Sequence, residues 1–139
     1  MPITRRDLSF LLPLLASRAG AEQGESKVLP THVYANGDIP YTGDDKKKTR
    51  TFFQGTTHKN FELQCHETIL GPGIQTHAPH KHEHEEIIFI FEGTVETWEE
   101  GRTQLAPAGS VVYFSSNKMH SSRNAGSGPC RYYVLELRG

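Results

Sequence analysis

The stretch from Gly73 to Gly93 limits the possible folds of this chain more than any other part. It contains four of the eight histidines. His80 and His82 lie two residues apart, so on an extended strand both side chains leave the same face. Glu86 follows after three intervening residues, at the head of an apolar run that predicts the next strand. Two neutral imidazoles and a carboxylate that converge in this way are ligands for Zn, Fe, Ni, Cu or Mn.

We expect the fourth ligand from elsewhere, and His120 is the only histidine in the last third of the chain. The alternative is that the histidine-rich stretch is a solvated loop, to which Lys81, Glu83 and Glu85 are suited. A loop gives no reason for the strand pattern and tight turn that follow. The pattern therefore favours a metal site over structural or fortuitous histidines.

The segment His80-x-His82-x3-Glu86-x6-Gly93 resembles the first motif of the cupin family, G-x5-H-x-H-x3,4-E-x6-G. The match has no gap from the histidines onward. The leading glycine, Gly73, lies one residue too far from His80. This half of the resemblance alone is moderate evidence.

A second segment resembles the other cupin motif, G-x5-P-x-G-x2-H-x3-N. It appears as Gly101-x5-Pro107-x-Gly109 and then as His120-x3-Asn124, with ten residues in place of two between Gly109 and His120. Both motifs occur in order, and the resemblance extends over about residues 49 to 137. It implies a small single-domain cupin of the conserved-barrel type, an all-β jelly roll also called a double-stranded β-helix.

The resemblance also implies one divalent transition metal, which is Mn, Fe, Ni, Zn or Cu, held by four side chains. These are His80, His82, Glu86 and His120. Gly93 and Asn124 are assigned to strand-end and turn structure instead. Two other histidines compete for a role. His84 forms a rival H-x-H pair with His82 but loses the motif's spacing to the carboxylate, and His77 is either a proton carrier at the mouth of the site or a solvated loop residue.

Residues 1–21 have the features of a targeting segment. Arg5 and Arg6 precede an apolar run, and Ala19-Gly20-Ala21 satisfies the small-x-small cleavage rule. The paired arginines resemble a twin-arginine signal, which exports folded proteins. The apolar run is too short to span a bilayer, so no stable membrane anchor is expected. We therefore expect an exported, periplasmic protein; the alternative is an amphipathic tail on a cytosolic one.

The remaining chain divides into a polar arm, residues 22–48, and a β-barrel domain, residues 49–139. The arm has a possible short strand at residues 31–34. Short runs between turn signals are typical of an all-β sandwich or barrel. The predicted strands are residues 49–56, 61–70, 86–91, 94–99, 102–105, 110–114, 120–123 and 130–137. The formal net charge of −1 gives no reason to expect a nucleic-acid partner.

Alternation along the strands predicts which faces are buried. In residues 61–70 one face is largely apolar and the other polar, as in a half-buried strand. If Glu86 points inward, then Ile87, Phe89 and Phe91 form an apolar outer face that needs a cover, either another strand or a second subunit. A homodimer through this face or through the N-terminal strands is therefore expected. Cys65 and Cys130 fall in strands that the family places side by side, and two buried free thiols are favoured over a disulfide.

The resemblance implies a metal with open coordination positions, which a catalytic metal needs. The sequence contains no serine or cysteine nucleophile pattern, so the metal would carry the chemistry. We expect a small metalloenzyme that oxidises, decarboxylates or isomerises a small molecule; the alternative is a cupin that binds a small ligand or a metal without turnover. An apo-barrel interaction module is a third, weaker reading. The candidates to line the cavity are Gln75, Tyr113, Met119 and Tyr132.

Overall fold

This computed structural model describes residues 28–139 of the chain. They contain nine β-strands and no helix. Those residues accordingly contain no helix long and apolar enough to cross a membrane. The expected targeting segment, residues 1–21, lies outside the described residues. The strands are β1 (Thr42–Gly43), β2 (Lys47–Thr56), β3 (Glu62–Leu70), β4 (Glu85–Glu92), β5 (Thr94–Glu99), β6 (Arg102–Pro107), β7 (Val111–Phe114), β8 (His120–Asn124) and β9 (Cys130–Arg138).

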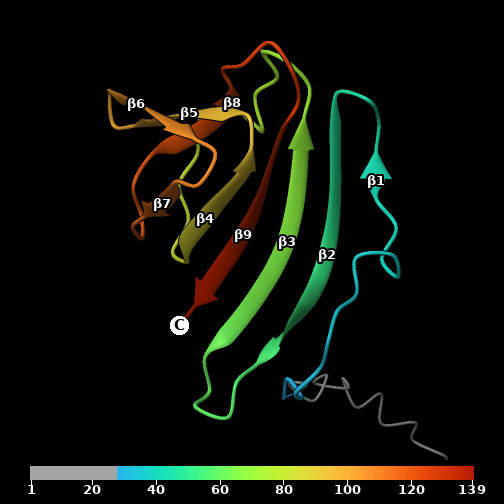
Figure 1. The fold of residues 1–139 in the computed structure, drawn as a ribbon. Helices are drawn as coiled ribbons and strands as arrows, with labels where there is room; N and C mark the ends of the chain where they lie inside the picture. The colour runs from blue at the N-terminus through green and yellow to red at the C-terminus, as the bar shows by residue number, and fades with distance from the viewer. Residues whose placement is uncertain (1–27) are drawn as a thin grey trace, which may run out of the picture.

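The strands form two antiparallel sheets (Figure 1). The larger has six strands in the order β1-β2-β3-β9-β4-β7, and the smaller has three in the order β6-β5-β8. The last strand, β9, lies between β3 and β4 and pairs with both. The expected all-β jelly-roll fold is confirmed, and most strand boundaries agree with the sequence pattern within two residues.

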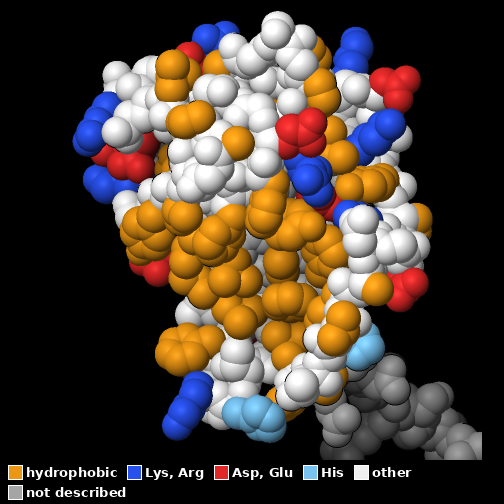
Figure 2. Space-filling model, in the orientation of Figure 1, with side chains coloured by type: hydrophobic (Ala, Val, Ile, Leu, Met, Phe, Trp, Pro, Cys, Tyr) orange, Lys and Arg blue, Asp and Glu red, His pale blue; other side chains and the backbone are white. Residues whose placement is uncertain are grey.

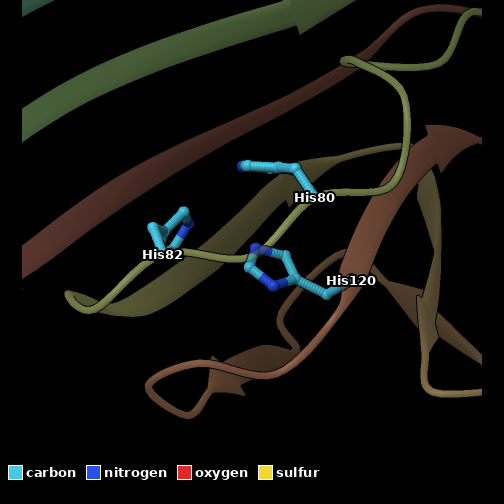
Figure 3. A group of neighbouring side chains, drawn as sticks. All are labelled: His80, His82 and His120. Carbon is cyan, nitrogen blue, oxygen red and sulfur yellow. The ribbon is translucent and has the colours of Figure 1, made fainter.

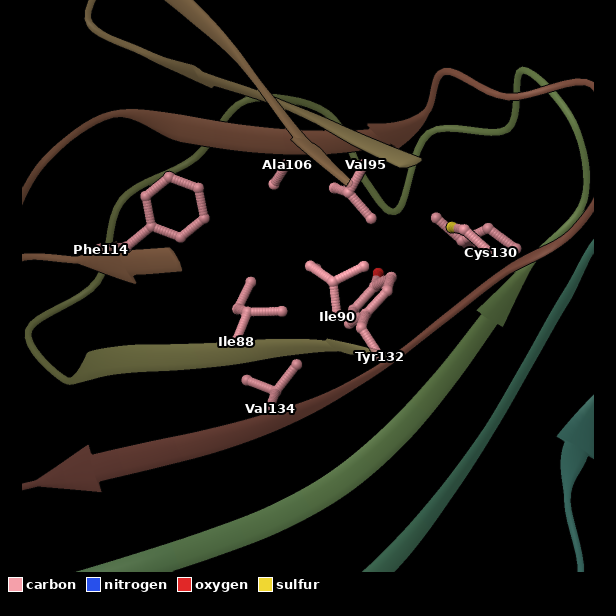
Figure 4. Close-up of a cluster of buried hydrophobic side chains, with 9 residues drawn as sticks. Ile88, Ile90, Val95, Ala106, Phe114, Cys130, Tyr132 and Val134 are labelled. Carbon is pink, nitrogen blue, oxygen red and sulfur yellow. The ribbon is translucent and has the colours of Figure 1, made fainter. Parts of the chain in front are cut away.

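The hydrophobic core fills the space between the two sheets (Figure 4). Side chains from the larger sheet meet those of the smaller sheet there, and each buried Ile or Val contributes about 1.5–3 kcal/mol. The core residues are Leu70, Ile88, Ile90, Val95, Ala106, Phe114, Cys130, Tyr132 and Val134. Strand β4 contributes Ile88 and Ile90, so its alternate residues point outward, as the sequence predicts for an inward Glu86.

The buried face of β3 differs from the expectation. The pattern suggested that the more apolar face, with Cys65 and Ile69, would be buried. Instead His66 and Thr68 line the interior of the barrel, because each pairs across the sheet with an inward-facing residue of β9. A barrel with a polar cavity needs polar side chains on its inner wall, and this demand overrides the simple rule that the apolar face is buried.

The N-terminal arm also differs from the expectation, because residues 31–34 form no strand. A buried ion pair holds the arm instead. Arg50 of β2 donates from Nε to Glu67 of β3 at 2.5 Å, and also donates to the carbonyl oxygens of Asn36 and Ile39 in the arm. Tyr41 donates its hydroxyl hydrogen to the same carboxylate at 2.8 Å. Glu67 is 0 % exposed and Arg50 6 %.

Gly93 makes the turn between β4 and β5 with a φ of 75°. A Cβ at this position would lie 2.8 Å from the carbonyl oxygen of Pro129 and 2.9 Å from the Cα of Cys130. Both the left-handed backbone and the close approach therefore require glycine. The role assigned to Gly93 from the motif, a strand end, agrees with this geometry.

Both cysteines are free thiols. They lie on the neighbouring strands β3 and β9, but Cys65 pairs with Leu135 and Cys130 with Leu70. Five residue positions along the strands thus separate them, which is too far for a disulfide. Burial raises the pKa of the Cys130 thiol to about 11.

Candidate metal centre

Backbone pairing brings His80 and His120 together although forty residues separate them in the sequence. The amide of His80 donates to the carbonyl oxygen of His120 at 3.1 Å, and the amide of His120 donates back to His80 at 2.9 Å. This isolated bridge attaches the segment before β4 to the edge of β8. Two residues further along this segment, His82 lies beside the same bridge.

The three imidazole rings surround a common space (Figure 3). The ring centroids lie 5.0 Å apart for His80 and His82, 4.9 Å for His80 and His120, and 4.8 Å for His82 and His120. One nitrogen of each ring lies within 4.8 Å of a nitrogen of the others. Ligands of a single ion lie at such separations.

Each ring leaves one buried nitrogen without a hydrogen-bond partner. These atoms are His80 Nδ1, His82 Nε2 and His120 Nε2. The other nitrogens of two rings are engaged: His82 Nδ1 donates to the carbonyl oxygen of His84 at 2.8 Å, and His120 Nδ1 to that of Lys118 at 2.8 Å. These bonds fix the tautomer and turn a lone pair toward the common space, as is usual for metal-binding histidines. The donor set therefore fits a divalent transition metal.

The carboxylate of Glu86 lies beside two of these nitrogens. Its Oε1 is 3.3 Å from Nε2 of His82, and its Oε2 is 3.6 Å from Nε2 of His120. Ligands bound tetrahedrally at about 2.1 Å from one ion are about 3.4 Å apart. The structure thus brings three of the sequence-predicted residues, His80, His82 and His120, into one group. The fourth, Glu86, lies beside His82 and His120 and falls in a second group with His82 and His84.

The electrostatics of the group suit a cation. Burial raises the pKa of Glu86, but the nearby His120 ring and the charge of His82 outweigh that effect, so the pKa of Glu86 is lowered. Burial and the neighbouring histidines lower the pKa of His80, so its ring is neutral near pH 7. Burial also opposes the charged form of His120, but Glu86 raises its pKa overall. A metal that binds His120 must therefore displace a proton.

His84 and His77 flank this group. The ring of His84 stacks on that of His82, with centroids 3.5 Å apart and planes at 5°, and its Nε2 lies 3.6 Å from Oε1 of Glu86. The rival pair His82 and His84 is therefore within reach of the same carboxylate, a proximity that the sequence spacing did not indicate. The ring of His77 contacts that of His80 edge-on, with ring centroids 3.9 Å apart.

A small cavity of about 40 Å³ adjoins the histidines inside the barrel. Such a volume has room for a few water-sized groups. Of the four residues proposed from the sequence to line it, only Tyr132 does so; Tyr113 and Met119 are exposed, as is Gln75. The lining residues are His66, Thr68, Thr76, His77, Glu86, Ile88, His120, Ser122, Tyr132 and Val134. Four polar lining residues, His66, Thr68, Thr76 and Ser122, were not predicted, and the polar face of residues 61–70 was the signal for the first two.

The sequence profile of the Cupin domain matches residues 66–136. This match covers half of the chain and includes Glu86, His120 and both motifs from the histidines onward. The protein therefore belongs to the cupin family, as the motifs indicated.

Solved structures of cupins share the fold at low sequence identity. KdgF from Halomonas sp. superposes with a TM-score of 0.64 and 15% identity, covering 78% of this chain and 96% of its own. The polyketide cyclase RemF from Streptomyces resistomycificus superposes with a TM-score of 0.62 and 18% identity, over 80% of this chain and 81% of its own. A predicted oxalate decarboxylase from Thermotoga maritima superposes with a TM-score of 0.63 and 19% identity, over 78% of this chain and 100% of its own. No curated protein sequence matches the chain.

Proposed function

We propose that this protein is a metal-dependent cupin enzyme that acts on a small molecule. The observation that carries the proposal is the set of three buried ring nitrogens without hydrogen-bond partners, turned toward one point beside the Glu86 carboxylate. Burying polar atoms without partners costs free energy, and a bound ion removes that cost.

The bound metal would supply a Lewis acid that polarises an oxygen of the substrate. His80, His82, Glu86 and His120 would hold it, and the carbonyl oxygens of His84 and Lys118 would keep two of the rings in place. Three imidazoles and one carboxylate leave positions open on a six-coordinate ion. The adjoining cavity is where a substrate would reach them.

The mixed lining of the cavity favours turnover of a small molecule over simple metal storage. Its lining combines hydroxyl groups of Thr76, Ser122 and Tyr132 with the apolar Ile88 and Val134. Such a mixture of apolar wall and a few convergent polar groups is typical of a substrate pocket. Among similar structures are a polyketide cyclase and a predicted oxalate decarboxylase, which supports an enzyme of this broad kind. The second candidate is a cupin that binds a metal or ligand without turnover.

Metal analysis of the protein purified through its native route tests the proposal. We expect close to one transition-metal ion per chain. The loaded protein is then screened for oxidation, decarboxylation and isomerisation of small acids and carbonyl compounds. A protein that takes up no metal contradicts both candidates and leaves a barrel without a metal function. A loaded protein with no activity supports the binding alternative.

We further propose that the protein is exported to the periplasm through its twin-arginine-like segment. The support is the Arg5-Arg6 pair followed by an apolar run and Ala19-Gly20-Ala21. A folded export route suits a protein whose metal is loaded before export. The N-terminus of the native protein decides this, because a chain found in the cytoplasm that begins at residue 1 or 2 contradicts export.

The outer face of the larger sheet supports the proposal of a homodimer. Phe89 and Phe91 are 39 % and 52 % exposed. Phe91 contacts Tyr133 with ring centroids at 4.7 Å, and Tyr133 contacts Phe52 at 5.3 Å, so the apolar surface is continuous across β4, β9 and β2. Figure 2 shows hydrophobic side chains gathered in the middle of the molecule. A second copy is the occupant we propose, because one self-complementary patch suffices for a two-fold interface.

A further inference from the structure

A second pair of ionisable side chains stands on the cavity wall formed by β3 and β9. In the register of these strands, His66 lies opposite Val134, and Gln64 lies opposite Glu136. His66 and Glu136 are therefore diagonal neighbours on the inner face, a spacing at which long side chains interact. Nδ1 of His66 is 3.6 Å from Oε1 of Glu136. Neither residue is one of the four proposed ligands, although Glu136 pairs with Glu86 across the sheet and its Oε2 lies 3.5 Å from Nε2 of His84.

Glu136 is held in a fixed position. It is 7 % exposed, and its Oε2 accepts a hydrogen bond from Nε of Arg138 at 2.9 Å and a second one from Nη2. The amide of Gln64 lies 3.5 Å from Oε1. An anchored carboxylate beside one ring nitrogen limits how an imidazole can turn. Nδ1 of His66 lies near this carboxylate and 3.5 Å from the amide nitrogen of Gln64, and the His66 side chain lines the cavity.

The surroundings of His66 keep its ring neutral near pH 7. Burial lowers its pKa, and the charges of Lys47 on β2 and Arg138 on β9 lower it further. Glu136 on β9 and Glu86 on β4 raise the pKa, but less than burial lowers it. A neutral imidazole on the wall of a substrate cavity is the usual form of a general base.

We propose that His66 is the acid–base group of this site and that Glu136 is its positioning residue. This rests on the proposed function, because a bound metal is needed to hold the substrate. The substrate class is a small carbonyl or hydroxy acid with a C–H bond next to the oxygen that the metal polarises. His66 accepts that proton on Nε2, the electron pair of the C–H bond stays on the substrate, and the proton returns to the same or a neighbouring atom.

The proposed step is balanced without an oxidant or reductant. It therefore favours isomerisation or a related proton-transfer reaction among the three chemistries expected from the family. If His66 and Glu136 only pack in the barrel wall, substituting them lowers the stability of the fold. It then leaves the rate of proton exchange by the folded protein unchanged.

The test uses the full chain loaded with zinc and pyruvate as the probe, because pyruvate offers two oxygens to a metal and an exchangeable methyl group. Exchange of the methyl hydrogens with deuterium in D₂O is followed by NMR, and bound zinc is measured in the same samples. The variants are His66→Gln and Glu136→Gln, with the exposed His58→Gln as the matched control. We expect unchanged zinc content in all three variants and an exchange rate about 10²-fold lower in His66→Gln.

The variant Glu136→Gln distinguishes a role of Glu136 in positioning His66 from a role in packing alone. Without the carboxylate the pKa of His66 falls, so the pH midpoint of exchange moves to lower pH; a filling residue would leave it unmoved. Equal exchange by wild type and His66→Gln, with zinc fully bound, overturns the proposal and leaves the metal function intact. Loss of zinc in His66→Gln also overturns it, because His66 then belongs to the metal centre. Failure of the wild type to bind zinc refutes the proposed function itself.

Discussion

The buried ion pair between Arg50 and Glu67 predicts a large loss of stability when Glu67 is replaced by Gln. The substitution keeps the shape of the side chain but leaves the guanidinium of Arg50 without its carboxylate in a buried position. Removing one partner of such a pair costs about 3–5 kcal/mol. Arg50 keeps its bonds to the carbonyl oxygens of Asn36 and Ile39, which places the loss at the lower end, about 3 kcal/mol.

Urea denaturation and thermal melting measure this loss. For a chain of this size, about 3 kcal/mol corresponds to a fall in the melting midpoint of about 12 °C. The matched control is Glu96→Gln, which removes the carboxylate from a two-bond pair with Arg123 on the surface. Surface pairs contribute little because water screens them, so the control should melt close to wild type.

The result that would refute this reasoning is a loss for Glu67→Gln no larger than that for Glu96→Gln. A second variant separates the charge from the packing. In Arg50→Met/Glu67→Leu both charges are removed together, and much of the stability lost in the single variant should return. If the double variant is less stable than Glu67→Gln, the pair holds the arm by its hydrogen bonds rather than by its charge balance.

Four further predictions concern the metal centre and the surfaces. His82→Ala should abolish stoichiometric metal in elemental analysis, whereas His84→Ala should retain most of it; the reverse result would show that the motif was read in the wrong register. Removal of the metal with EDTA should destabilise the fold, by about 2.7 kcal/mol when the free metal had been at a hundred times its Kd, and an unchanged melting curve would contradict binding. Gly93→Ala should lower stability by about 1–3 kcal/mol, measured in urea, because of the left-handed backbone and the contact with Pro129. Phe91→Lys should convert a dimer to a monomer in light scattering, and a monomeric wild type would refute the proposed interface.

The sequence predicted the strands and three of the candidate ligands, His80, His82 and Glu86, because both depend on short-range patterns. Parity places His80 and His82 on one face, and alternation turns Glu86 inward together with Ile88 and Ile90. The pairing of His80 with His120 followed only from the family resemblance, since no local pattern connects residues forty positions apart.

The interior of the cavity could not be predicted in the same way. His66 and Glu136 are seventy positions apart, and only the register between β3 and β9 makes them neighbours. The rule that apolar residues are buried also predicted the wrong inner face for β3, because the cavity beside the candidate metal centre needs a polar wall. Residues 31–34 had the β-branched and aromatic composition of a strand, but Arg50 and Glu67 hold the arm through polar contacts instead.

The position of β9 has a consequence for the order of events in the cell. Residues 130–138 follow all the other described strands in the chain, yet they lie between β3 and β4 and join the two halves of the larger sheet. While these residues are still inside the ribosome, β3 and β4 have no shared partner, and the cavity lacks the wall that carries Tyr132. A nascent chain therefore cannot assemble the pocket piece by piece. The wall of the cavity is therefore complete only after β9 has been synthesised and has inserted between β3 and β4.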